Sequence, residues 1–205
     1  HADTDLSGTG LLPQSMAASD PKQAYTLYDN ARNRMTMLAL NATRWIAGDA
    51  LWSSTAYYRE SERSTANGDV NQVSDPRSGV LPYEDGDPNA SSVNRTRTLQ
   101  RSYGFSTQAA IRSETAAGRR NLLIVGGGYD RSTSEFRQTY QLGGFGADRS
   151  ATPTGAETEI VNLDGGSATA SLFVTDTHSP VPQWHLTGSA RYNATRVQTT
   201  DGLSP

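Results

Sequence analysis

The chain has 205 residues, of which 35% are hydrophobic and only 19% charged, and its formal net charge is −3. This balance argues against a nucleic-acid-binding face, which needs excess basic charge to displace counterions from phosphates. The absence of cysteine excludes disulfides, thiolate metal sites and cysteine nucleophiles within the chain. The 9 Tyr, 4 Phe and 3 Trp are too many aromatic residues for a disordered chain, so we expect a β-protein with long polar loops.

The first part of the chain contains one predicted loop and one predicted hairpin. Residues 1–31 are punctuated by Gly, Pro, Ser and Asp and predict a long loop. Residues 32–45 have a β-like composition, and a turn signal follows at 47–49. A second β-like run covers 51–63, so the two runs predict a hairpin with a short turn.

The middle of the chain repeats this arrangement after a long polar stretch. Residues 64–93 contain Asn-Gly, Asp-Pro and Asp-Gly pairs and predict a loop longer than compact domains usually carry. A third strand is expected over 94–112 and a fourth over 120–139, with a turn at 115–118 between them.

The last part contains a third hairpin. A long loop is expected at 140–166, followed by strands over 168–177 and 183–199 that are joined by a turn at 179–182. Residues 200–205 are expected to start a further loop.

The connections therefore alternate short, long, short, long, short. Outer-membrane β-barrels have short turns on the periplasmic side and long loops on the extracellular side. We therefore predict an all-β fold, an antiparallel up-and-down transmembrane β-barrel segment of about six strands in the bacterial outer membrane. In this prediction the barrel strands occupy 32–199, and the loops at 1–31, 64–93 and 140–166 are extracellular.

Residue alternation supports a wall with one lipid-facing side. In the sixth strand Trp184, Leu186, Gly188, Ala190 and Tyr192 share one face. The residues between them point to the other face and are polar. The third strand alternates in the same way from Tyr103 onward. In the first strand two methionines compete with two leucines for the apolar face, so its register stays open.

Aromatic residues lie where the two membrane interfaces are expected. All three tryptophans lie within a few residues of a short turn, and tyrosines stand further along the strands. The predicted interface aromatics are Trp45, Trp52, Trp184, Tyr58, Tyr103 and Tyr192. Three tryptophans near strand ends in the core of a soluble sandwich are the competing interpretation.

Four segments resemble the TonB-dependent outer-membrane receptors that import ferric chelates and other scarce nutrients. They are RNRMTMLALNATRW (32–45), YYRESERSTANGDVN (57–71), NRTRTLQRSYGFSTQ (94–108) and VTDTHSPVPQWHLTGSARYNATRV (174–197). The resemblance implies a 22-stranded barrel around an N-terminal plug, with energy supplied by a TonB-type periplasmic protein that acts through the plug. The sequence shows no plug and no binding box for that partner, and about six strands cannot close such a barrel. We therefore expect an internal piece of a longer barrel.

Chemistry-bearing motifs are weak. His1, His178 and His185 form no metal-ligand or triad pattern, and the glycines at 126–128 lack the spacing of a phosphate-binding loop. The acidic run at 84–87 lacks the later glutamate of a calcium loop. We expect no catalytic site, no cofactor and no metal site.

Three arginines, Arg95, Arg97 and Arg101, share the face of Tyr103 and lie on its extracellular side. Guanidinium groups match phosphate oxygens well, so we predict that these residues face lipopolysaccharide at the outer leaflet. The alternative is a solvated row of charge on a protruding strand.

Ligand contacts are expected from aromatic and basic residues near the extracellular loops. The candidates are Tyr83 in the first long loop and Phe136, Arg137, Tyr140 and Phe145 in the second. Such a lining would suit an anionic, ring-bearing ferric chelate. The polar Gln100, Gln108, Arg191 and Asn193 point into the predicted lumen, where we expect them to contact the plug.

The sequence thus favours an outer-membrane receptor that binds a scarce nutrient, such as a ferric siderophore, and imports it to the periplasm. The alternatives are a soluble secreted β-sandwich or adhesin-like binding module, a diffusion porin, and a barrel that carries an esterase.

Overall fold

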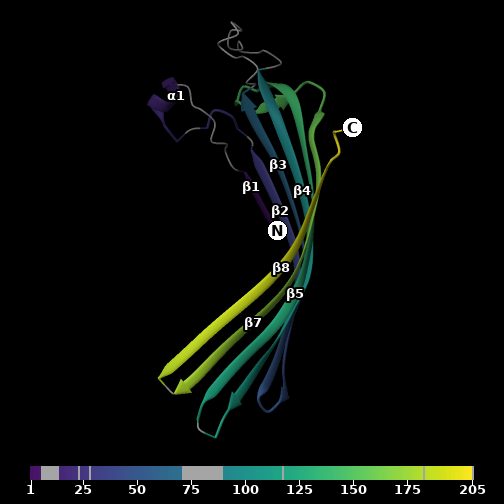
Figure 1. The fold of residues 1–205 in the computed structure, drawn as a ribbon. Helices are drawn as coiled ribbons and strands as arrows, with labels where there is room; N and C mark the ends of the chain where they lie inside the picture. Colours follow the sequence, from purple (N-terminus) through teal and green to yellow (C-terminus); the bar gives the residue numbers. More distant parts are fainter. Residues whose placement is uncertain are drawn as a thin grey trace.

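A single long sheet dominates the computed structural model, which describes residues 1–5, 14–22, 24–27, 29–70, 90–116, 118–181 and 183–204. The sheet is one layer thick, strongly twisted and curved along its length (Figure 1). Short turns lie together at one end, and the helix and the connection over residues 146–157 lie at the other (Figure 1).

Six long strands form the body of the sheet in sequence order, and every pair is antiparallel. They are β2 (Asn30–Ala47), β3 (Ala50–Val70), β4 (Ser91–Glu114), β5 (Arg120–Phe145), β7 (Thr158–Val181) and β8 (Trp184–Asp201). This up-and-down arrangement confirms the predicted fold class. Their lengths of 18 to 26 residues exceed the roughly 9–11 residues that cross a bilayer, so each strand extends well beyond one membrane thickness.

Three small elements lie at the end with the longer connections. Strand β1 (Ala2–Asp5) pairs with β2, the helix α1 covers Gln14–Ser19, and β6 (Ala151–Pro153) pairs with β5. The region predicted as a loop at 1–31 therefore contains a strand and a helical turn. Among the described residues, no helix is long and apolar enough to cross a membrane.

Strand ends differ from the sequence predictions mainly at this end. Strand β5 continues to Phe145 and β7 begins at Thr158, so the predicted loop at 140–166 is reduced to residues 146–157. Strand β3 likewise continues to Val70. These extensions contain the Gly, Asn and Asp residues that are typical of loops, but cross-strand backbone hydrogen bonds extend the ladder through them.

Short connections join the six long strands into three hairpins. Residues 48–49 join β2 to β3, and residues 115–119 join β4 to β5, where Gly118 takes the positive φ of 73° that the turn requires. Strand β7 continues to Val181 and β8 begins at Trp184, so the third hairpin is longer than the prediction of a turn at 179–182.

The register gives the sheet two distinct faces. Paired residues in an antiparallel sheet point to the same side, so each row of partners across the strands belongs to one face. One row contains Leu40, Ala56, Phe105, Tyr129, Ala170 and Ala194, and the neighbouring row on the other side contains Asn41, Thr55, Ser106, Gly128, Ser171 and Asn193. We call the first side the apolar face and the second the polar face. The open register of β2 is thereby resolved, with Leu38 and Leu40 on the apolar face and both methionines on the polar face.

Within the described chain, no second layer covers the apolar face. Leu40 and Tyr192 are each 70% exposed, and Leu172 is 67% exposed. The buried hydrophobic residues are small and few, namely Ala31, Ala90 and Val93, and they lie near the end with the longer connections. The sheet therefore has no conventional hydrophobic core of its own.

Glycines in the middle of β5 allow close packing across the wall. A Cβ on Gly126 would lie 2.7 Å from the carbonyl oxygen of Thr107 and would overlap the ring of Phe173. On the other face, the side chain of Leu172 closes over Gly127, where a Cβ would meet it at 2.9 Å. Glycine is required here because neighbouring side chains cover the strand on both sides.

Substitution Gly126→Ala tests this packing. We expect a loss of about 1–3 kcal/mol in the free energy of unfolding, because the Thr107 backbone cannot move away from the added methyl group. Urea unfolding of the full-length protein in lipid vesicles measures the change. Gly166→Ala is the matched control, since its added Cβ meets its nearest atom only at 3.9 Å. Equal free energies of unfolding for the two variants would show that the close packing at Gly126 does not contribute to stability.

Candidate functional site: an apolar band and a polar face

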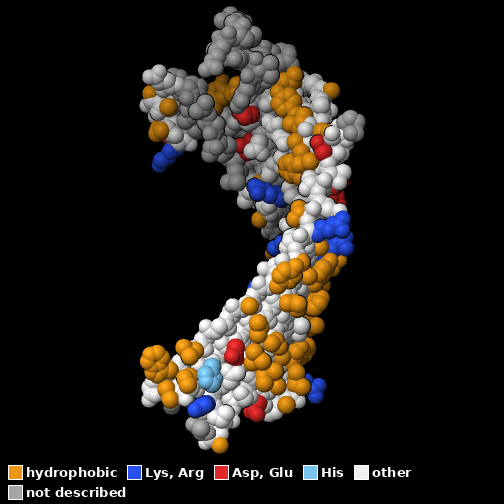
Figure 2. Space-filling view, in the orientation of Figure 1, with side chains coloured by type: hydrophobic (Ala, Val, Ile, Leu, Met, Phe, Trp, Pro, Cys, Tyr) orange, Lys and Arg blue, Asp and Glu red, His pale blue; other side chains and the backbone are white. Residues whose placement is uncertain are grey.

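Hydrophobic side chains on the apolar face form a band across all six long strands. On β4 the band extends from Tyr103 to Ile111, and on β8 from Trp184 to Ala194. Figure 2 shows the hydrophobic side chains gathered over the lower part of the sheet, below a group of basic side chains. The indole N–H of Trp52 donates to the hydroxyl of Thr107 at 2.8 Å, which satisfies this polar group inside the band.

Tyrosines mark one edge of the band. Tyr58 and Tyr103 are direct cross-strand partners, and Leu38 completes their row on β2. We call these residues the tyrosine row. The same cross-strand row continues through Arg131 on β5 and Arg196 on β8, and in the next row Glu60 pairs with Arg101. Charged residues on the apolar face therefore begin at the tyrosine row.

The other predicted interface aromatics divide between the faces. Trp52, Trp184 and Tyr192 lie on the apolar face, as expected from their spacing. Trp45 differs, because its partner is Leu51 and the pair belongs to the polar face. The sequence indicated that Trp45 is near the turn, but only the cross-strand register shows its face.

The predicted lipopolysaccharide-facing arginines lie on the apolar face beyond the tyrosine row, and each has an acidic neighbour. Arg101 contacts Glu60 at 2.8 Å, Arg97 contacts Glu62 at 2.8 Å, and Arg95 lies 3.6 Å from Glu157. The sequence analysis missed these acidic partners. The alternation of Glu60 and Glu62 with the same period as the arginines was the signal that could have revealed them.

Strand β1 forms a further ion pair with β2. Asp3 contacts Arg32 at 3.0 Å and accepts a hydrogen bond from the amide of Asn30 at 2.9 Å. The amide of Asn30, and then the charge of Arg32, lower the pKa of Asp3 below its ordinary value. Asp3 is therefore held in its charged form, which attaches β1 to the edge of β2.

The polar face carries a hydrogen bond that crosses a strand. The hydroxyl of Tyr57 on β3 donates to Asp130 on β5 at 2.8 Å, although β4 lies between them. Gly104 makes this contact possible, because a Cβ there would overlap Asp130 and lie 2.9 Å from the Tyr57 ring. A tyrosine over a cross-strand glycine covers backbone that would otherwise be exposed.

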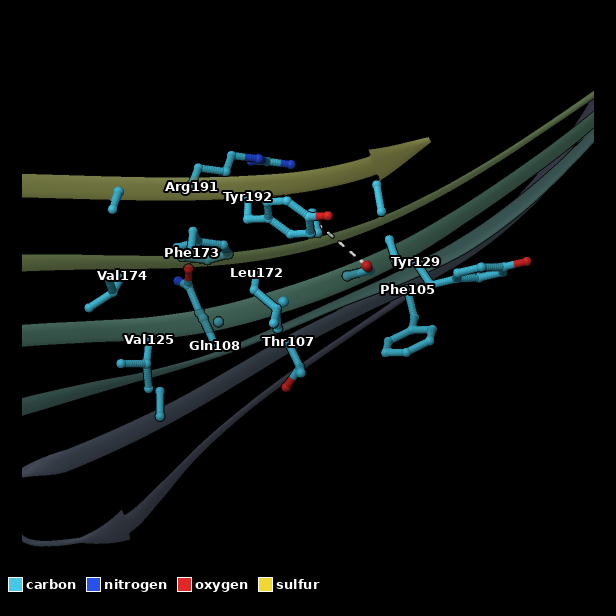
Figure 3. Close-up of a pocket in the computed structure, with 18 of the residues that line it drawn as sticks. Phe105, Thr107, Gln108, Val125, Tyr129, Leu172, Phe173, Val174, Arg191 and Tyr192 are labelled. Atoms are coloured by element: carbon cyan, nitrogen blue, oxygen red, sulfur yellow. Dashed lines mark hydrogen bonds between the residues drawn. The ribbon is translucent and has the colours of Figure 1, made fainter. Parts of the chain in front are cut away.

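A small recess lies on the polar face, between the Tyr57–Asp130 contact and the short turns. Its volume is about 330 Å³, and Ser53, Thr55, Ser106, Gln108, Phe173 and Arg191 contribute to its lining from this face. The guanidinium of Arg191 lies 6.0 Å from the centroid of the Phe173 ring. Figure 3 shows these two side chains on one side of the strands and Leu172 and Val125 on the other. The recess combines hydroxyl groups with one cation, a combination suited to polar or anionic groups.

The predicted ligand-binding residues do not come together at one site. Phe136, Arg137, Tyr140 and Phe145 all lie on β5, not in the second long loop where the sequence placed them. Phe136 and Tyr140 belong to the polar face, whereas Arg137 lies on the apolar face and contacts Asp164 at 2.8 Å. Phe145 packs edge-on against Tyr25, with ring centroids 5.8 Å apart. Tyr83 lies outside the described residues.

The described residues contain no group of three or more metal-ligating side chains. The Nδ1 atom of His185 lies 2.7 Å from the hydroxyl of Ser179, but within the described chain no carboxylate contacts this ring. A serine nucleophile needs a base that a third group orients. The pair therefore lacks one component of a catalytic triad.

Removal of the Tyr57 hydroxyl tests the contact across β4. We expect Tyr57→Phe to lower the free energy of unfolding by about 1 kcal/mol, because Asp130 loses its hydrogen-bond donor. Tyr129→Phe is the control on the apolar face, since the Tyr129 hydroxyl has no hydrogen-bond partner in the described ranges. Urea unfolding in vesicles compares the two variants, and equal effects would contradict a specific role for the Tyr57–Asp130 contact.

Comparison with known proteins identifies the fold. No protein-family model matches the chain, and no curated protein sequence matches it significantly. Among solved structures, the ferric citrate transporter FecA in its unliganded form, a TonB-dependent receptor, matches over 98% of this chain with a TM-score of 0.73 and 13% sequence identity. The chain spans about a quarter of that protein, since the match covers 26% of its length. The chain therefore has the fold of a segment of that protein's β-barrel, which confirms the predicted all-β, antiparallel up-and-down barrel segment.

Proposed function

We propose that the chain is part of an outer-membrane transporter that binds a scarce nutrient, such as a ferric chelate, and releases it to the periplasm. The observation that carries the proposal is the consistent alternation of apolar and polar rows across six paired strands. The match to the fold of a transporter supports it. Transport of this kind requires binding and conformational change and needs no covalent step by the chain.

In this proposal the apolar face contacts lipid. The row from Leu40 to Ala194 contains only hydrophobic residues, and Phe105 in its centre is 53% exposed. Such exposure is unfavourable in water over so large an area but favourable against acyl chains. The tyrosine row would lie at the outer interface, and Trp52 and Trp184 would lie near the inner one.

The polar face would line the lumen. There the recess beside Arg191, the Tyr57–Asp130 contact and the predicted residues Gln100 and Asn193 would face the plug or the passing ligand. A TonB-type energy-coupling protein would act through the plug, and not through the wall. Phe136 and Tyr140 remain candidates for ligand contact because they lie on the polar face, in the part of β5 nearer the longer connections.

A bilayer also requires partners for the free edges of the sheet. Outside its pairing with β1, the outer edge of β2 has no partner strand among the described residues, and neither has the outer edge of β8. Unpaired backbone groups in hydrocarbon cost several kcal/mol each. The proposal therefore requires that further strands pair with both edges in the membrane.

Substitutions at two neighbouring positions on β4 test which face of the sheet contacts lipid. In the full-length protein, we expect Phe105→Arg to destabilise the folded state by about 2–4 kcal/mol in bilayers, because it places a charge against lipid. We expect Ser106→Arg to have a much smaller effect, because that charge would face the aqueous lumen. Folding into lipid vesicles, measured by urea titration, gives both values. A larger cost for Ser106→Arg would reverse the assignment of the faces.

Uptake by cells tests the transport function and separates it from passive diffusion. We expect cells that express the full-length protein to accumulate more radiolabelled iron from a panel of ferric chelates than cells that lack it. An uncoupler should abolish the difference, because the proposed transport depends on an energised inner membrane. Uptake that persists with the uncoupler would indicate a diffusion porin.

A further inference from the structure

Four arginines line one groove on the apolar face, beyond the tyrosine row. The groove has a volume of about 480 Å³ and receives Arg32 from β2, Arg95 and Arg97 from β4, and Arg137 from β5. Small side chains on β3, Ser64 and Ala66, form its floor between the arginines. We call this feature the arginine groove. It includes two of the three arginines predicted to face lipopolysaccharide and adds Arg32 and Arg137, which lie far apart in the chain.

Among the residues that the structure describes, no acidic side chain lines the arginine groove, although each arginine has one acidic contact at its edge. These carboxylates belong to Asp3, Glu62, Glu157 and Asp164. The side chains of Arg32 and Arg97 remain 66% and 64% exposed despite these contacts. Exposed ion pairs contribute little, and a guanidinium has five donors, so the arginines retain donors for a further anion.

The position of the groove indicates which anion it meets. Arg97 lies six residues beyond Tyr103 on β4, about 20 Å along the strand and about 15 Å in height after the usual tilt. If the tyrosine row lies at the lipid interface, Arg97 lies farther from the acyl chains than phosphates that are attached directly to acyl-bearing sugars. Arg101, only two residues beyond Tyr103, lies closer to that level.

We propose that the arginine groove binds phosphate groups on the core saccharide of lipopolysaccharide. The proposal rests on the proposed function, because the groove must face the outer leaflet. Four guanidinium groups from three strands would surround a phosphorylated sugar, and paired N–H donors match phosphate oxygens in geometry and charge. Arg101 belongs to a different level and is not part of this site.

Titration of the full-length protein in detergent tests the site directly. The probes are lipopolysaccharide with a phosphorylated core, a matched form without core phosphates, and inorganic phosphate. We expect the native protein to prefer the phosphorylated core, and the double substitution Arg95→Gln with Arg97→Gln to lower that affinity roughly tenfold or more. Glu62→Gln should strengthen binding, because it releases Arg97 from a competing carboxylate.

Arg101→Gln is the matched control on the same strand and face. It should preserve the ratio of affinities for the two glycolipids, even if it weakens both. Equal binding of the two glycolipids by the native protein, or an unchanged ratio in the double variant, would overturn the proposal. Binding of inorganic phosphate as tight as that of the phosphorylated glycolipid would also overturn it, because the site would then recognise free phosphate.

The barrel itself is monitored separately in each variant by the shift in gel mobility between unheated and heated samples. A variant that retains this shift but loses glycolipid preference affects the groove alone. Failure of the Phe105 and Ser106 experiment, in contrast, would remove the membrane assignment on which the groove depends.

Discussion

Continuous antiparallel pairing is the constraint on which the rest of this structure depends. Each long strand shares an uninterrupted or nearly uninterrupted register with its neighbours, and irregularities are confined to positions near strand ends. Side chains alternate with a period of two, so a slip of one residue in any strand would move its apolar residues to the polar face. The apolar band, the tyrosine row and the arginine groove all exist because the register is kept across six strands.

The same register explains why the two faces meet different demands. On the apolar face most side chains are small, aliphatic or aromatic, and the indole N–H of Trp52 finds a hydroxyl on the neighbouring strand. On the polar face, Tyr57 reaches Asp130 across a glycine, and Arg191 lies near Phe173. Glycines at Gly104 and Gly126 permit these contacts, since larger residues would separate the partners.

Much of this fold was predictable from the sequence, whereas the sites were not. Six strands, three short turns and the apolar face of β4 and β8 follow from alternation and turn residues alone. Strand ends beyond Arg63 and Thr139 were missed, because these segments contain Gly, Asn or Asp residues that are typical of loops. The site residues depend on which strands lie opposite each other. Trp45 and Arg137 were therefore grouped with residues from which the register separates them, and Arg32 was not recognised as a neighbour of Arg95 and Arg97.

The unequal lengths of the connections at the two ends affect how the sequence of such a wall can evolve. Where β2 passes into β3 through two residues, an insertion would shift every partner on both strands, so this end tolerates little variation. The opposite ends of the strands are joined by segments whose length does not affect pairing below them. New recognition properties can therefore arise there by exchange of whole segments, while the framework beneath keeps its dimensions.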